Sequence, residues 1–203
     1  MRRGSVRVGP FASWIALVVL GALAALAPRA DAQPADIAAI QAREARNADQ
    51  RTLAALERFG AALIARYGGD PTLTMLGVSE TEGEALAQRS PGAAPEHVIR
   101  QGERWIGTEG RQLRPWADAP VAAMHAFPLS SMRTAGIRAW LDAWRKLPGR
   151  ATDFVTRYEA GYDPADGRVV VRAHVGSMTT GRLSLHAFDP ATGAPIAREP
   201  PRR

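Results

Sequence analysis

Apolar and polar residues alternate with a period of two in three segments near the C-terminus. The segments begin at Phe154, Val169 and Leu183, and residues of the opposite parity are mostly arginine, glutamate, serine or histidine. A period of two is typical of a strand that buries one face. Turn-forming residues separate the segments, at 163–167 and 176–181, and such short connections favour antiparallel neighbours. The pattern therefore predicts an antiparallel β-meander.

The same parity predicts which side chains the meander buries. The expected apolar face comprises Phe154, Thr156, Tyr158, Ala160 and Tyr162, then Val169, Val171, Ala173 and Val175, then Leu183, Leu185 and Ala187. A register that pairs Val175 with Leu183 places His174 and His186 together on the opposite, polar face. A three-stranded sheet covers too little apolar area to be stable alone, so we expect a helix to cover it.

The covering helix is predicted immediately upstream of the meander. Four apolar residues recur there at helical spacing, namely Ile137, Trp140, Leu141 and Trp144. Ser130 or Ser131 is the expected N-cap, and Pro148 and Gly149 are expected to end the helix. We therefore predict that both tryptophans pack on the sheet.

A second, longer helix is predicted over Pro34–Tyr67, a segment of strong helix formers without an internal proline. Its second half carries an apolar stripe of Leu53, Leu56, Phe59, Leu63, Ile64 and Tyr67. Its first half, Gln41–Arg51, is polar, so it should project from the domain or fray. A solvated helix end and a partner-binding arm are both compatible with this composition.

The middle of the chain predicts shorter elements. Leu73–Val78 suits a strand, and Ser79 with Glu82 forms a capping-box pattern for a helix ending near Ser90. That helix would place Glu80, Glu82 and Glu84 in its first turns, where the macrodipole favours carboxylates. Glycines punctuate residues 97–116, which favours hairpins, and residues 117–128 resemble a surface connector.

Together these elements predict an α+β fold. An antiparallel C-terminal β-meander packs against a helix that bears two tryptophans, and a long N-terminal helix precedes both. The expected organisation is a helix over 33–69, an α+β domain over 70–198 and a disordered tail over 199–203.

The N-terminal segment predicts export. Arg2, Arg3 and Arg7 precede an apolar stretch from Phe11 to Ala27, and a small-x-small sequence at residues 30–32 follows it. This order is typical of a cleaved signal peptide over 1–32, so the mature chain should begin near Gln33 in the periplasm or outside the cell. The alternative is an uncleaved membrane anchor, because the apolar stretch is near the short limit of spanning length.

Charge and cysteine content narrow the function classes. The formal net charge is +6, but removing residues 1–32 takes away four arginines and one aspartate and lowers it to +3. A body this close to neutral does not indicate nucleic-acid binding. The chain contains no cysteine, which excludes disulfides and thiolate chemistry. Neither a nucleophile elbow nor a phosphate loop is present, and we expect no cofactor and no metal.

Three groups of residues are candidates for binding. His174 and His186 on adjacent strands favour either a shared metal or a solvated polar face, and nearby Arg172 and Arg182 would repel a metal. Arg157, Arg168, Arg172 and Arg182 on the same face favour either anion recognition or a soluble surface. Trp105 and Trp116 flank a Gly- and Arg-rich segment, where they suit a ligand groove or core anchors.

The C-terminal part resembles the end of a PepSY-type domain. A helix and three strands are expected to lead into Asp189, Thr192 and Gly193, which match the Asp-x-x-Thr-Gly turn after that family's final strand. The resemblance covers about 65 residues. It implies an exported, non-catalytic module associated with peptidase inhibition or envelope regulation.

These features predict a non-enzymatic accessory protein that binds another component of the cell envelope, with no nucleic-acid partner and no membrane anchor after cleavage. Two alternatives remain open. One is a small envelope hydrolase that uses scattered groups such as Glu103, Glu109 and His125. The other is an oligomeric structural subunit that assembles through the long helix.

Overall fold

The computed structural model describes residues 34–90, 93–107, 125–163 and 167–197. The chain divides into two compact units, one up to Ala38 and one from Ala39 onward. The described part of the first unit is the start of a helix, and everything below concerns the second unit. The predicted signal peptide, the 199–203 tail and residues 108–124 lie outside the described ranges.

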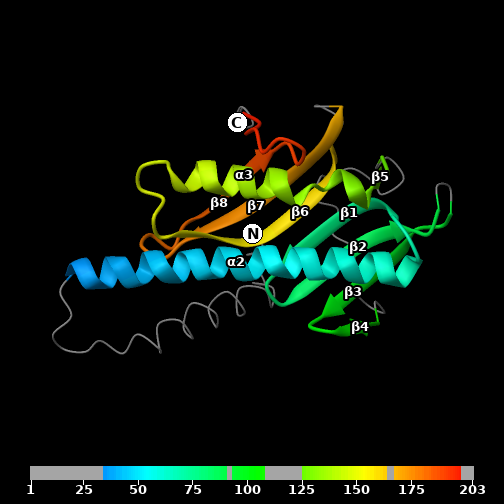
Figure 1. The fold of residues 1–203 in the computed structure, drawn as a ribbon, viewed down its shortest axis with the longest axis horizontal. Helices are drawn as coiled ribbons and strands as arrows, with labels where there is room; N and C mark the ends of the chain where they lie inside the picture. The colour runs from blue at the N-terminus through cyan, green and yellow to red at the C-terminus, as the bar shows by residue number, and fades with distance from the viewer. Residues whose placement is uncertain (1–33, 91–92, 108–124, 164–166, 198–203) are drawn as a thin grey trace, which may run out of the picture. The chain divides into compact units, whose positions relative to one another are not determined.

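The described elements follow one another along the chain as two helices and eight strands (Figure 1). In order they are α2 (Pro34–Tyr67), β1 (Thr72–Ser79), β2 (Glu82–Gln88), β3 (Glu96–Gln101), β4 (Arg104–Ile106), β5 (Phe127–Pro128), a 3₁₀ turn (Leu129–Ser131), α3 (Thr134–Arg145), β6 (Asp153–Asp163), β7 (Arg168–Ser177) and β8 (Leu183–Phe188). The predicted α+β class is confirmed.

The described strands form one antiparallel sheet in the order β4-β3-β2-β1-β6-β7-β8, and the short β5 pairs with the start of β1. The sheet consists of two meanders that meet where β1 pairs with β6. Gly102 and Gly167 occupy left-handed conformations in the tight turns after β3 and before β7, with φ of 56° and 63°. A residue with a Cβ would be strained at either position.

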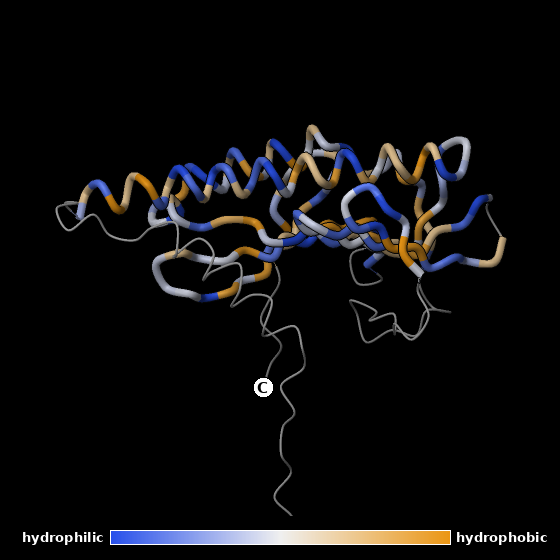
Figure 2. The backbone as a smooth tube through the Cα atoms, turned by 90° about the horizontal axis from the view of Figure 1, so that it is seen from below, coloured by the Kyte–Doolittle hydropathy of each residue, from blue (hydrophilic) through white to orange (hydrophobic). Residues whose placement is uncertain are grey.

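Both helices lie on the same side of the sheet, as the two perpendicular views show (Figures 1 and 2). Trp140 and Trp144 of α3 are only 3% and 7% exposed, and the ring of Trp140 stacks on Phe188 at 4.5 Å between centroids. Phe59 of α2 packs on Gly83 of β2 so closely that a Cβ there would lie 2.4 Å from the ring. The predicted packing of the tryptophan helix on the meander is confirmed.

The helix predicted after Ser79 is wrong, because this segment forms strand β2. Ser79 Oγ accepts a hydrogen bond from the N–H of Glu82 at 3.2 Å, as in a capping box, but the bond closes the β1–β2 turn. Ala85 and Ala87 alternate into the core below α2. The three glutamates therefore lie in a hairpin, and Glu84 projects to the sheet face opposite the helices.

The parity predicted for the meander is correct in β7 but wrong in parts of β6 and β8. An irregularity between Val155 and Arg157 shifts the register with β7, so Val155 joins Tyr158 in the core and Phe154 turns to the other face. In β8 the buried residue is Phe188, whereas Leu183 and Leu185 are 61% and 54% exposed. The tryptophan rings of α3 pack on the face of β8 that carries Phe188. Leu183 and Leu185 belong to the opposite face, so they point away from the core.

Two predictions about the helices also need correction. Helix α3 begins at Thr134, and Ser131 instead donates its hydroxyl to the Pro128 carbonyl in the preceding 3₁₀ turn. The polar half of α2 does not all project, because Asp49 is buried at 3% exposure and Ala45 and Ala48 are buried beside it.

Candidate functional site

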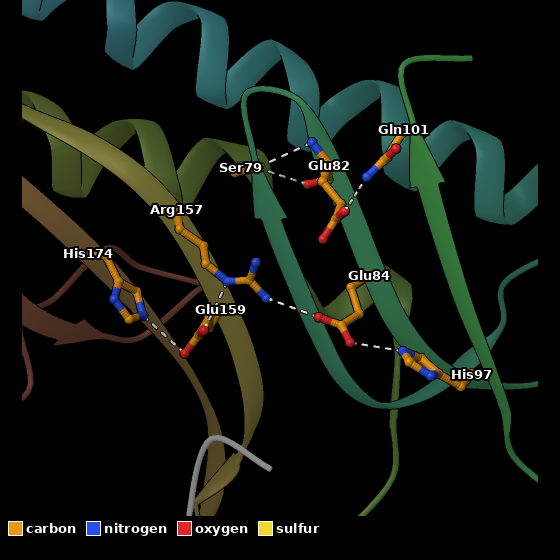
Figure 3. A network of polar contacts seen from close by, with 8 residues as sticks. All are labelled: Ser79, Glu82, Glu84, His97, Gln101, Arg157, Glu159 and His174. Carbon is orange, nitrogen blue, oxygen red and sulfur yellow. Dashed lines mark hydrogen bonds and ion pairs between the residues drawn. The ribbon is translucent and has the colours of Figure 1, made fainter. Parts of the chain in front are cut away.

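A row of charged side chains crosses the sheet face opposite the helices (Figure 3). We call it the charged row, and it comprises His97 of β3, Glu84 of β2, Arg157 and Glu159 of β6, and His174 of β7. The strand register brings these residues together, because Gly77 of β1 pairs with both Glu84 and Glu159, and Arg157 pairs with His174.

Carboxylates alternate with arginine and histidine side chains along the charged row. His97 Nε2 lies 2.8 Å from Glu84 Oε1, and Glu84 Oε2 lies 3.3 Å from an Arg157 nitrogen. Arg157 Nε donates to Glu159 Oε1 at 2.9 Å, and His174 Nε2 lies at ion-pair distance from Glu159, 3.0 Å from Oε2. Each carboxylate therefore bridges two cationic or imidazole groups.

Gly77 allows the charged row to cross β1. A Cβ at this position would lie 2.1 Å from the Arg157 Nη2 atom, so the guanidinium occupies the space that a side chain would fill. Arg157 thereby reaches from β6 across β1 to Glu84 on β2. Any other residue at position 77 would force the guanidinium to move.

The row is partly shielded from solvent, and the neighbours of Glu159 set its charge. Burial acts to raise the pKa of this carboxyl, but His174 and Arg157 together outweigh that effect and hold its pKa below the usual value. The carboxylate form is thus stabilised by its neighbours. The two carboxylates thus keep the row from being a strongly cationic surface.

The predicted arginine cluster is held largely in ion pairs. Arg172 is 8% exposed and pairs with Asp163 at 3.2 Å, and Arg168 pairs with Asp189 at 3.2 Å. Arg182 lies in the turn before β8, where its amide donates to Thr180 Oγ1. The arginines of β6 and β7 therefore have carboxylate partners within the protein.

The two histidines predicted to lie together on the polar face are on opposite faces of the sheet. His174 pairs with Leu185, and His186 pairs with Ala173, a register one residue away from the predicted one. A shift of one residue exchanges the faces of a strand. His186 packs on Trp144 at 4.1 Å between centroids, and desolvation followed by the charge of Arg150 lowers its pKa. In the described ranges, no three His, Asp or Glu side chains group as metal ligands.

The remaining candidate residues lie on separate elements. Trp105 of β4 contacts Phe59 at 6.0 Å and lies under the Arg66 guanidinium at 4.8 Å, so it anchors the α2 side of the sheet. Glu103 occupies the β3–β4 turn, and the ring of His125 lies 4.3 Å from that of Tyr162. Trp116 and Glu109 lie outside the described residues.

The outer edge of β8 carries a feature that the sequence reasoning missed. Strand β8 is the last in the sheet order, and the Ala187 carbonyl accepts the Ile196 N–H at 2.8 Å on its outer side. Backbone groups two residues apart point the same way, so those of Leu183 and Leu185 also point outward. Both leucine side chains are exposed on the face of the charged row, where Leu185 neighbours His174. The sequence contains one indication of this arrangement. Phe188 is a large apolar residue whose side chain lies on the opposite face of β8 from Leu183 and Leu185.

No protein family, curated protein or solved structure was found to match this chain. Among the helices of the described ranges, none combines the length and the apolar character needed to cross a membrane.

Proposed function

We propose that this protein is a non-enzymatic accessory protein, exported to the periplasm or beyond, that acts by binding another protein of the cell envelope. The observation that carries this proposal is the edge of β8. There, two exposed leucines stand beside outward-pointing backbone groups that pair with no described strand. Sheet edges with unpaired backbone groups and apolar side chains are templates for pairing with another chain.

The occupant that fits this edge is an extended segment of a partner protein. Such a segment adds one strand to the sheet, with its main chain bonded to Leu183 and Leu185 and every second side chain beside the leucines. The chain's own Ile196 already pairs with Ala187 in this way, which sets the downstream limit of the free edge. Polar residues of the partner would meet His174 and Arg157 at the adjoining end of the charged row.

The export component of the proposal is supported by the signal-peptide pattern of residues 1–32. The resemblance to a PepSY-type domain supports the non-catalytic component. Asp189 Oδ1 accepts the N–H groups of Ala191 and Thr192 at 2.8 and 3.1 Å, and Gly193 adopts a φ of 75°, so the turn that carries the resemblance is well formed.

Capture from envelope extract by variants of the β8 edge tests this proposal. Leu185→Pro removes an outward N–H without removing a bond to β7, because proline is tolerated on the open side of an edge strand. The double variant Leu183→Ser, Leu185→Ser keeps the backbone and removes the apolar contacts. We expect both to lose the partner that wild type captures, and a photocrosslinker at position 183 of wild type should map to an extended segment of it.

Leu147→Ser is the matched control, because Leu147 is also an exposed leucine, at 49%, but lies outside the sheet. It should capture the partner as wild type does, and all variants should melt near the wild-type temperature. Equal capture by Leu185→Pro and wild type, or no specific partner for wild type, would contradict the proposal.

A further inference from the structure

A cleft lies between the second half of α2 and the turns at one end of the sheet. It has a volume of about 450 Å³, and its lining includes Ala55, Arg58 and Phe59 of α2, Val78 of β1, Arg100 of β3, and Glu103 of the β3–β4 turn. The Gly102 N–H bonds to the Thr81 carbonyl at 3.3 Å, so the two turns that form its rim are tied together. Its size is in the range of small-molecule sites.

The floor of the cleft is apolar. Phe59 and Val78 are buried, and Gly83 presents no side chain where the Phe59 ring packs on it. An apolar floor provides favourable contact for a short hydrocarbon or ring.

Two guanidinium groups in the cleft have unused hydrogen-bonding capacity. Arg100 Nε is buried and has no hydrogen-bond partner, and neither Arg58 nor Arg100 has a carboxylate partner among the described residues. By contrast, Glu80 is bound by Arg51 at 2.8 Å, and Glu82 accepts from Gln101 at 2.7 Å. These two carboxylates are thus engaged by other residues, and leaving a buried donor without an acceptor lowers the stability of the folded state.

We propose that this cleft binds a small organic acid with one carboxylate and a short apolar tail. The carboxylate accepts from Arg100 and Arg58, in the bidentate geometry that guanidinium groups favour, and the tail lies on Ala55 and Phe59. A single negative charge fits better than two, because Glu80, Glu82 and Glu103 also line the cleft. The site is separate from the β8 edge and does not depend on it.

Titration of the mature protein with octanoate, followed by two-dimensional NMR, tests this proposal. For a ligand of this size we expect a dissociation constant of about 1 mM or tighter, with shifted signals from Ala55, Phe59 and Gly83. Octan-1-ol and octylammonium have the same tail without the carboxylate and should bind at least about tenfold more weakly.

Arg100→Gln should weaken octanoate binding about tenfold or more, and Arg58→Gln should weaken it to a smaller degree. Arg104→Gln is the control, because Arg104 is an exposed arginine that does not line the cleft. Ala62→Phe, which fills the cleft without changing charge, should also abolish binding, and melting curves should show every variant folded. Octanoate that fails to bind at 10 mM, about tenfold above the expected constant, or that binds Arg100→Gln as it binds wild type, overturns the proposal.

Discussion

Asp49 of α2 accepts a hydrogen bond from the backbone N–H of Val155 in β6, with 2.7 Å between Oδ1 and the nitrogen. Thr52, one turn later, donates its hydroxyl to the carbonyl of the same Val155 at 3.1 Å. Strand β1 pairs with β6 only from Arg157 onward, so these polar groups of Val155 extend past the end of β1. Side chains of α2 therefore replace a missing strand, and Arg145 of α3 also bonds to Asp49, at 2.8 Å from its Nε.

Replacing Asp49 should destabilise the protein strongly. Asp49→Ala leaves the largely shielded Arg145 without its carboxylate and the buried Val155 N–H without its acceptor, and breaking a buried pair of this kind costs about 3 to 5 kcal/mol. Urea unfolding measures the change. The exposed neighbour Gln50 is the control, because Gln50→Ala should stay within about 0.5 kcal/mol of wild type. Equal unfolding midpoints for the two variants would show that the Asp49 contacts contribute nothing.

The two helical glycines Gly136 and Gly60 should respond to alanine with opposite signs. A Cβ at Gly136 would lie 2.1 Å from the Pro190 carbonyl oxygen, because the turn after β8 rests against α3 there. Overpacking against backbone should cost Gly136→Ala about 1 to 3 kcal/mol. Nothing lies within 4 Å of the corresponding position at Gly60, so Gly60→Ala should stabilise the helix by up to about 1 kcal/mol. Thermal unfolding of both variants checks the signs, and a stabilised Gly136→Ala would refute the close approach.

A double-mutant cycle should detect the crossing of Arg157 over Gly77. Gly77→Ala displaces the guanidinium and breaks its 3.3 Å contact with Glu84, and we expect a loss of about 1 kcal/mol. In an Arg157→Ser background there is no guanidinium to displace, so the same alanine should be neutral. The free energies of unfolding of wild type, the two single variants and the double variant give the coupling energy between positions 77 and 157. Equal effects of the alanine in both backgrounds would mean that position 77 acts through the backbone alone.

Stability should fall on mild acidification because of His186. Desolvation, followed by the charge of Arg150, lowers the pKa of His186 below its ordinary 6.5, and Asp153 opposes this only in part. The unfolded chain therefore takes up the proton at higher pH than the folded one. The contribution of neutral His186 to the free energy of unfolding is complete above about pH 6.5. It is lost as the pH falls through the folded-state pKa, and the free energy of unfolding then changes by at most about 1.4 kcal/mol per pH unit.

Urea unfolding at pH 7.5, 6.5 and 5.5 measures this dependence, and His186→Gln isolates it, because the other titrating groups are unchanged. The variant should lose less stability than wild type between pH 7.5 and 5.5. Parallel curves for the two proteins would assign the pH dependence to other residues.

The sequence was sufficient for the elements whose periodicity is strong and local. The helix that bears Trp140 and Trp144, the long α2 and the three C-terminal strands all follow from spacing within one segment. The capping-box chemistry of Ser79 and Glu82 did not distinguish a helix start from a hairpin turn, because the same hydrogen bond closes both.

The errors in the candidate site have a different origin, which is register. One residue of slip in β8 moved His186 to the α3 side and Leu185 to the charged row, and no local pattern fixes such a slip. Asp49 looked solvated for a related reason. Its partners Arg145 and Val155 lie 96 and 106 residues away in the sequence, and only the folded chain brings them to α2.

The junction between β1 and β6 also has a kinetic consequence. Every other long pairing in the sheet joins strands that are consecutive or nearly so, whereas Met75 pairs with Gly161. Closing so large a loop carries an entropic cost that hairpins avoid, and such nonlocal contacts slow folding. We therefore expect the two meanders to form first and their union to limit the rate, so that substitutions at Leu76 or Ala160 slow folding while leaving the rate of unfolding almost unchanged.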